Sequence, residues 1–304
     1  MERREFFKKS VAAGFVTALG SYKNVLGLNI PNQSQTYDLV AVRGGEPEEM
    51  FDQGIASLGG MKNFVKKNQK VVVKPNIGWD VTPERAANTN PKLIGRIVKH
   101  CFDAGAKEVL VFDNTCDNWI KCYQNSGIEK AVKDAKGKIV PGNSESYYQN
   151  VEVKKGKRLT KTKVHELILD CDVFINVPIL KNHGSAKLTI AMKNLMGIVW
   201  DRGYWHRNDL HQCITDFATY ERKPDLNIVD AYNVMMQNGP RGVSVNDVSQ
   251  MKSLLISKDM VAIDAAAAKI FGMEPEDVKY IKIADEMKVG TMNLQKLNIN
   301  RIMI

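Results

Sequence analysis

Cysteine is scarce in this sequence, with five among 304 residues. So small a number excludes the disulfide-rich scaffolds of short secreted domains. No four cysteines lie close together, and we therefore do not expect an iron–sulfur cluster of the ferredoxin type held by this chain alone. Cys116 and Cys122 are six positions apart in a predicted loop, and they could form a disulfide or remain ordinary thiols.

Long apolar runs and several common functional motifs are also missing. No run approaches the ~20 apolar residues that a membrane-spanning helix needs, so we expect no transmembrane domain in the mature protein. The sequence contains no Gly-x-Gly-x-x-Gly, no phosphate-loop lysine motif and no Gly-x-Ser-x-Gly. It therefore offers no signal for dinucleotide binding, for a phosphate-loop NTPase or for a serine hydrolase.

Charge of one sign is only moderately in excess. Lysine and arginine number 43 against 34 acidic residues, which gives a net charge of +9. The first 28 residues carry +3 of this charge, and the other +6 is spread without long runs. Nucleic-acid-binding proteins usually concentrate basic residues on one face, so we expect small anionic ligands and no nucleic acid as partner.

The N-terminal stretch MERREFFKKSVAAGFVTALG joins a basic start to small and apolar residues from Val11 to Gly20. About ten such residues suit the core of a signal peptide. The run from Arg3 to Lys8 resembles the twin-arginine export signal, although Glu2 stands where serine or threonine is usual. We predict a signal peptide and linker over residues 1–35, export by the twin-arginine machinery, and a location in the periplasm or cell envelope. An amphipathic helix is the alternative.

Residues 36–304 alternate short β-branched runs with helical stretches, and we expect them to form a single α/β domain. The runs Lys70–Lys74 and Glu108–Phe112 are continuously apolar at their centres, and Val173–Val177 is apolar except for one asparagine, as in strands buried on both faces. Strand–helix alternation predicts a mostly parallel central sheet with helices on both faces. We expect one helix to begin at Pro91, with Asn90 as its cap, and another to cover residues 164–169. The segment 143–163 breaks this alternation, and we expect it to be a small inserted hairpin region.

Polar residues follow four of the predicted strands, the three named above and a fourth at Leu226–Val229, at the point where each strand ends. Ligands of an open parallel sheet bind beyond the carboxyl ends of the strands, so these residues are candidates for one site. Ordinary capping and turn chemistry by Asp and Asn could explain some of them. The candidates in chain order are Lys74, Asn76, Asp113, Lys181, Asn182, His183 and Asp230.

The residue types suggest how such a site could work. Lys74 and Lys181 can neutralise a carboxylate or phosphate. Asp113 and Asp230 could act as bases or hold a hard cation, and His183 could carry a proton or bind a metal. These last three are our candidate catalytic residues and, as a set, candidate ligands of a divalent metal.

A second polar cluster begins at Lys193-Asn194 and continues through residues 201–211, where aromatic, basic and acidic side chains are dense. We expect Lys193 and Asn194 to bind ligand, with His206 in a loop at the mouth of the site and a helix beginning near Asp209. A structural loop with a solvated basic face is the alternative. Asp264 stands out within an alanine-rich helix, but it could simply face solvent.

With these residues in view, the body of the chain resembles the domain-of-unknown-function 362 family. The resemblance implies that the strand-end candidates from Lys74 to His183 belong to one site, and it names no substrate. Some relatives carry ferredoxin-like cysteine motifs, which this chain lacks. The matching segments are VVVKPNIGWD at 71–80, the turn at 88–91, AGAKEVLVFDN at 104–114, INVPILKNH at 175–183, LTIAMKNLMGIVWDR at 188–202 and SKDMVAIDAAAA at 257–268.

These observations lead to three hypotheses about function. The first is an exported enzyme that acts on a small carboxylate or phosphate, with or without a divalent metal, at the carboxyl ends of the strands. The second is a non-catalytic ligand- or cofactor-binding protein of the cell envelope. The third is an envelope scaffold whose polar loops form a protein interface.

Overall fold

Runs of β-branched residues form the centre of the sheet. In β2 (Lys70–Pro75), Val71, Val72 and Val73 are fully buried. Successive side chains of a strand point to opposite faces, and accordingly Val72 packs into one hydrophobic cluster while Val71 and Val73 pack into another. Both faces of the sheet are therefore covered, as continuous apolar runs predict.

The computed structural model describes residues 37–304. The signal peptide and linker predicted for residues 1–35 lie outside this part of the chain. Among the helices in residues 37–304, none combines the length and the apolar character needed to cross a membrane.

Ten strands in residues 37–304 form one sheet in the order β12-β1-β11-β10-β7-β2-β3-β4, with β8 paired to β10 and β9 paired to β8. Neighbours are parallel from β10 through β7, β2 and β3 to β4. Within this sheet of residues 37–304, only β11 and β9 run antiparallel to their neighbours, so the predicted mostly parallel sheet is confirmed. The bounds are β1 (Leu39–Arg43), β3 (Glu108–Val111), β4 (Lys138–Ile139), β7 (Val173–Val177), β8 (Ile179–His183), β9 (Lys187–Thr189), β10 (Leu226–Met235), β11 (Val248–Ser257) and β12 (Ile299–Met303).

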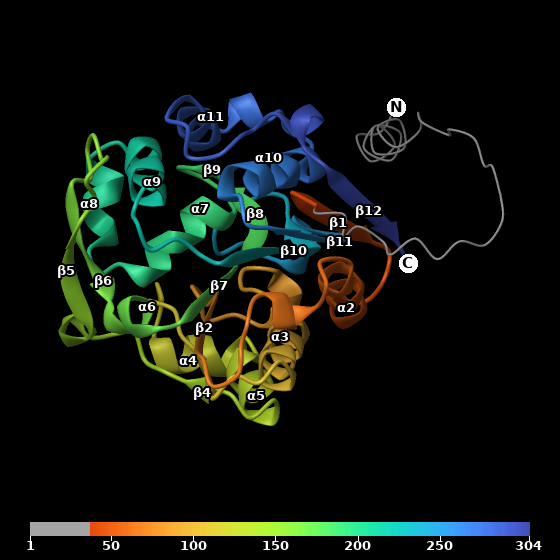
Figure 1. The fold of residues 1–304 in the computed structure, drawn as a ribbon. Helices are drawn as coiled ribbons and strands as arrows, with labels where there is room; N and C mark the ends of the chain where they lie inside the picture. The colour runs from red at the N-terminus through yellow and green to blue at the C-terminus, as the bar shows by residue number, and fades with distance from the viewer. Residues whose placement is uncertain (1–36) are drawn as a thin grey trace. The chain divides into compact units, whose positions relative to one another are not determined.

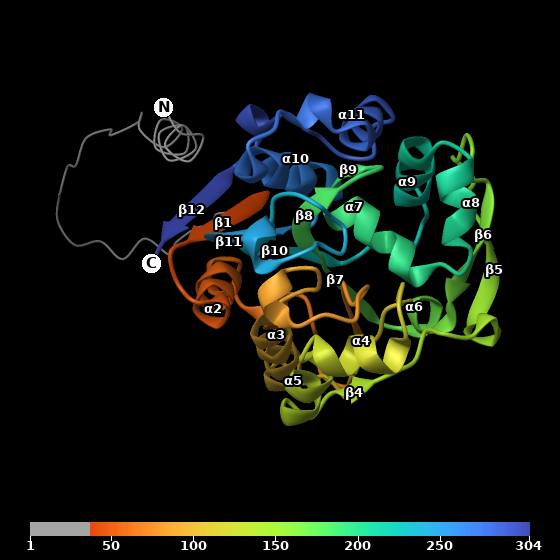
Figure 2. The same cartoon turned by 180° about the vertical axis from the view of Figure 1, so that it is seen from behind.

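Helices cover both faces of the sheet, in two groups that pack into the two hydrophobic clusters. Figures 1 and 2 show the groups on opposite sides of the strands. One group consists of α2 (Pro47–Ser57), α3 (Pro91–Asp103), α4 (Trp119–Asn125) and α5 (Ile128–Asp134). The other consists of α6 (Glu166–Asp170), α7 (Ala191–Asn194), α8 (Arg202–Arg207), α9 (Leu210–Ala218), α10 (Met260–Phe271) and α11 (Lys279–Glu286).

The inserted region forms a separate antiparallel hairpin of β5 (Tyr148–Glu152) and β6 (Lys161–His165). It contacts the segment before α8, where the Trp200 backbone N–H donates to the Lys163 carbonyl at 3.1 Å and Val199 bridges to Val164. The hairpin therefore reaches the polar segment that follows α7.

The chain leaves β2 and β7, which are neighbours, toward opposite faces of the sheet. The connection from β2 to β3 passes through α3 on one face, and the connection from β7 to β10 passes through α7 and α9 on the other. Such a switch point opens a crevice at the carboxyl ends of the two strands, where α/β proteins commonly bind ligands.

Candidate functional site

A cavity of about 350 Å³ lies at the carboxyl ends of β2 and β3, bordered by β8 and α7. Eight of the ten candidates named from the sequence line it, and Asn182 and Asp230 do not. The eight are Lys74, Asn76, Asp113, Lys181, His183, Lys193, Asn194 and His206. Residues from five separate parts of the chain thus meet at one place.

A buried ion pair forms the floor of the cavity. Lys74 Nζ lies 3.0 Å from Asp113 Oδ1, and the other oxygen of Asp113 accepts the Ile77 backbone N–H at 2.7 Å. Burial raises the pKa of Asp113 above and lowers the pKa of Lys74 below their ordinary values, and the attraction between the two charges opposes both shifts.

Two asparagine side chains connect this pair to Lys181. Asn194 Oδ1 accepts from Lys74 Nζ and from Asn76 Nδ2, each at 2.9 Å. Asn76 Oδ1 in turn accepts from Lys181 Nζ at 3.1 Å, and Lys181 also donates to the Ala87 carbonyl. Three strands and α7 are therefore tied together by one network of buried polar groups.

Gly197 lets the backbone after α7 approach the ion pair closely. A Cβ atom at this position would overlap both Asp113 Oδ1 and Lys74 Nζ. The Gly197 carbonyl also accepts the Asn114 backbone N–H at 3.0 Å. Only glycine fits the space between this segment and the end of β3.

Asp264 holds α7, the short helix that carries Lys193 and Asn194. Its two oxygens accept the backbone N–H groups of Ala191 at 2.7 Å and Met192 at 3.1 Å. The carboxyl is completely buried, and burial raises its pKa well above the ordinary value. Asp264 therefore does not face solvent; it fixes the first turn of α7 against α10.

Lys193 is 9% exposed and lines the cavity. No hydrogen bond or ion pair of its amine is found among residues 37–304. Burial lowers the pKa of Lys193 to about 8 and that of Lys181 to about 7, because desolvation disfavours the charged amine. Neighbouring cations add to the shift in both cases.

His183 and His206 lie on one side of the cavity with their rings stacked, 6.4 Å apart at the centroids. His183 Nδ1 accepts the backbone N–H groups of Ser185 and Ala186, both at 3.2 Å. The neutral ring therefore carries its hydrogen on Nε2. Burial lowers the pKa of His183 to about 3 and also lowers that of His206. His206 belongs to α8 and not to the loop that we expected.

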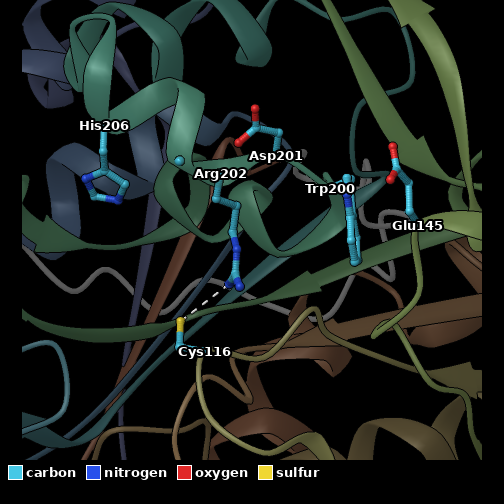
Figure 3. A pocket seen from close by; sticks show the side chains of 7 residues that line it. Cys116, Glu145, Trp200, Asp201, Arg202 and His206 are labelled. Carbon is cyan, nitrogen blue, oxygen red and sulfur yellow. Dashed lines mark hydrogen bonds between the residues drawn. The ribbon is translucent and has the colours of Figure 1, made fainter.

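Arg202 and Cys116 form the boundary between this cavity and a larger, more open one of about 590 Å³ (Figure 3). The Arg202 guanidinium donates to the carbonyls of Asn114 and Thr115, each at 2.7 Å, and its Nη1 lies 3.4 Å from Cys116 Sγ. Cys116 is exposed, Cys122 is buried, and both are free thiols.

The structure places Asp230 and Asn182 away from the cavity. Both oxygens of Asp230 accept backbone N–H groups, from Asn90 at 2.7 Å and Tyr232 at 3.0 Å, and burial raises its pKa to about 6. Asp230 thus supports the start of α3. Asn182 lies between Lys181 and His183 on β8, so its side chain points to the opposite face, where it accepts the Gly239 N–H.

Asp113, Asp230 and His183 are not brought together as a set of metal ligands. Asp113 faces Lys74, Asp230 holds two backbone N–H groups, and His183 Nδ1 accepts two more. In residues 37–304 there is no group of three or more His, Cys, Asp or Glu that could hold a metal ion. The described residues therefore do not fit the metal site predicted from the sequence.

Four residues at or beside the cavity were not named as site residues from the sequence. Arg202 and Gly197 lie in the conspicuous polar segment after α7, and their proximity to Lys193 could have suggested them. Cys116 follows Asp113 in the same loop. The sequence marks Asp264 as unusual but does not indicate which groups it binds. The backbone groups that bind Asp264 are more than 70 positions away along the chain, so no local sequence pattern could have indicated them.

The fold and this cavity define an α/β protein with a basic, solvent-accessible site at the carboxyl ends of its parallel strands. Residues 71–269 match the family described as Domain of unknown function (DUF362), and the chain belongs to that family. It is 27% identical over 229 residues to a thylakoid-associated protein of Synechocystis sp., covering 73% of this chain and 68% of that protein.

Two solved structures are similar in outline. The first is a protein from Thermotoga maritima, at 11% identity and a TM-score of 0.47, over 80% of this chain and 60% of that one. The second is the lactate racemase apoprotein from Thermoanaerobacterium thermosaccharolyticum, at 10% identity and a TM-score of 0.45, over 75% and 56%. The chain thus spans less than two thirds of either structure, and at such TM-scores neither likeness indicates a function.

Proposed function

We propose that this chain is an exported enzyme that binds a small anionic molecule, a carboxylate or a phosphate, in the cavity of about 350 Å³. The support comes from charge balance. Lys74, Lys181, Lys193 and Arg202 line the cavity against one carboxylate, that of Asp113. A buried cation without a counterion is costly, and an anionic ligand would supply the missing partner.

Lys193 is the observation that carries the proposal. The Lys74 amine is paired with Asp113, and Lys181 and Arg202 donate to protein oxygens. Lys193 alone among these four has no hydrogen-bond or ion-pair partner within residues 37–304. Its amine would bind the anion directly, and Lys181 and Arg202 would add positive potential around it.

Proton transfer would fall to Lys181, and His183 would orient the ligand. With a pKa of about 7, the Lys181 amine can take up or release a proton near neutral pH. His183 stays neutral at that pH and can donate a hydrogen bond from Nε2 to a ligand oxygen. The Lys74–Asp113 pair would hold the asparagine network, and through it the Lys181 amine, in place.

The test is anion binding by the purified protein, measured with sulfate and malonate by thermal shift and calorimetry. Lys193→Met should weaken binding at least tenfold, as expected for loss of a hydrogen bond to a charged group. Lys223→Met is the matched control, because Lys223 is exposed at the amino end of β10. The proposal fails if neither anion stabilises the protein, or if both variants bind equally.

The alternative of a non-catalytic binding protein is separated by His183→Ala and Lys181→Met. Once a turned-over substrate is known, these variants of an enzyme should lose turnover by a larger factor than binding. A pure binding protein has no turnover to lose.

A further inference from the structure

The cavity of about 590 Å³ differs in chemistry from the inner one, although the two share Cys116, Arg202 and His206. Its remaining walls include the indole of Trp200 and the carboxylates of Glu145 and Asp201 (Figure 3). An aromatic face with carboxylates beside it would not hold the anionic end of a ligand.

The outer wall is held in place by the inserted hairpin. The Trp200 backbone donates to Lys163 of β6, and its ring lies 5.4 Å from the ring of Tyr148 on β5. Glu145 forms an ion pair with the same Lys163 at 2.7 Å. The Trp200 ring is therefore positioned before any ligand arrives, which lowers the entropic cost of stacking on it.

We propose that the ligand has two parts: an anionic head group in the inner cavity and a planar aromatic group that lies against Trp200 in the outer one. This inference rests on the proposed function, since the inner cavity must hold the anion. The Arg202 guanidinium, which lines both cavities, marks the point where head group and ring join. Glu145 and Asp201 are already paired with Lys163 and Arg207, so these cations are not available to a second anionic group on the ring, and the two carboxylates repel it.

The experiment compares ligands that share a head group and differ in the tail. Calorimetry with the unmodified chain would use methylphosphonate against phenylphosphonate, and acetate against benzoate. We expect each aromatic member to bind about tenfold more tightly, the gain typical of one stacked ring. Terephthalate, with a second carboxylate on the ring, should bind more weakly than benzoate.

Trp200→Ala should remove the advantage of the aromatic ligands and leave the alkyl ligands unchanged. Tyr204→Ala is the control, because this exposed tyrosine is near the outer cavity but does not line it. Equal affinity for the alkyl and aromatic members in the unmodified protein would overturn the inference, whatever the variants do. If the protein binds sulfate or malonate but none of these ligands, this inference fails and the proposed function stands. If it binds none of these anions, sulfate and malonate included, the proposed function fails as well.

Discussion

Lys74 and Asp113 lie 3.0 Å apart with side chains only 1% and 3% exposed. They come from the ends of neighbouring parallel strands, β2 and β3, and each is also held by a group outside the pair. The ion pair is therefore both a structural junction and the floor of the cavity.

Replacing one partner of this pair should cost more than replacing both. Lys74→Met or Asp113→Leu leaves one buried charge alone, and each should lower the free energy of unfolding by about 3–5 kcal/mol. The double variant should lose less than the sum of the two single costs. Denaturant unfolding of all four proteins measures this, and strictly additive costs would show that the two side chains are not coupled.

Gly197→Ala should disturb the Lys74–Asp113 ion pair from the segment that follows α7. The added methyl group would overlap Asp113 and Lys74, so we expect a loss of about 2 kcal/mol, typical of overpacking, together with weaker sulfate binding. Gly184→Ala is the control, because its methyl group would meet nothing closer than 3.9 Å. Equal unfolding midpoints for the two variants would contradict the close approach at Gly197.

Sulfate affinity should fall as the pH rises from about 6.5 to 9.5. Lys181 and Lys193, with pKa values of about 7 and 8, lose their protons in this interval, while sulfate keeps its charge. Calorimetry across the interval measures the change. An affinity that stays flat would mean that neither amine contacts the anion.

The free energy of unfolding of the ligand-free protein should rise with pH over this range, whereas the sulfate affinity falls. The unfolded chain, whose lysines have their ordinary pKa near 10.5, binds more protons than the folded chain between pH 7 and 10.5. Lys181 and Lys193 therefore make a contribution to stability that rises with pH through this window. Lys181→Met should reduce that slope, and an unchanged slope would argue against a buried, depressed lysine.

The predicted export signal lies in residues 1–35, outside the part of the chain that the structure describes, and it can be tested by mutation. Changing Arg3-Arg4 to Lys-Lys should leave the protein in the cytoplasm, because the twin-arginine route depends on the paired arginines. Fractionation of cells that express each form measures this. Normal export of the changed form would refute the twin-arginine interpretation.

Local sequence patterns predicted much of the fold. Asn90-Pro91 predicted the start of α3, and the Asn90 side chain does accept the Lys92 backbone N–H at 3.0 Å. The local pattern gave the wrong secondary structure where pairing with another segment of the chain decides the conformation. Residues 164–169 suggested one helix, but Val164 and His165 pair with β5, and α6 begins only at Glu166.

The candidate site was predicted in outline because parallel strands end at the same edge. Lys74 and Lys181 meet there for that reason. Asp230 lies away from the cavity because a strand-end carboxylate can equally well bind backbone N–H groups. Asn182 lies away from it because side chains alternate along β8. The role of Asp264 depends on α10 packing against α7, a contact between distant segments that no local pattern records.

Because Arg202 is already anchored on two carbonyl oxygens, its guanidinium loses little rotational freedom when a guest molecule enters. A lysine in its place would have to be immobilised anew on each encounter. The dissociation rate of a tightly bound ligand should then be limited by breaking the contacts of the ligand itself, and not by rearrangement of the Arg202 side chain.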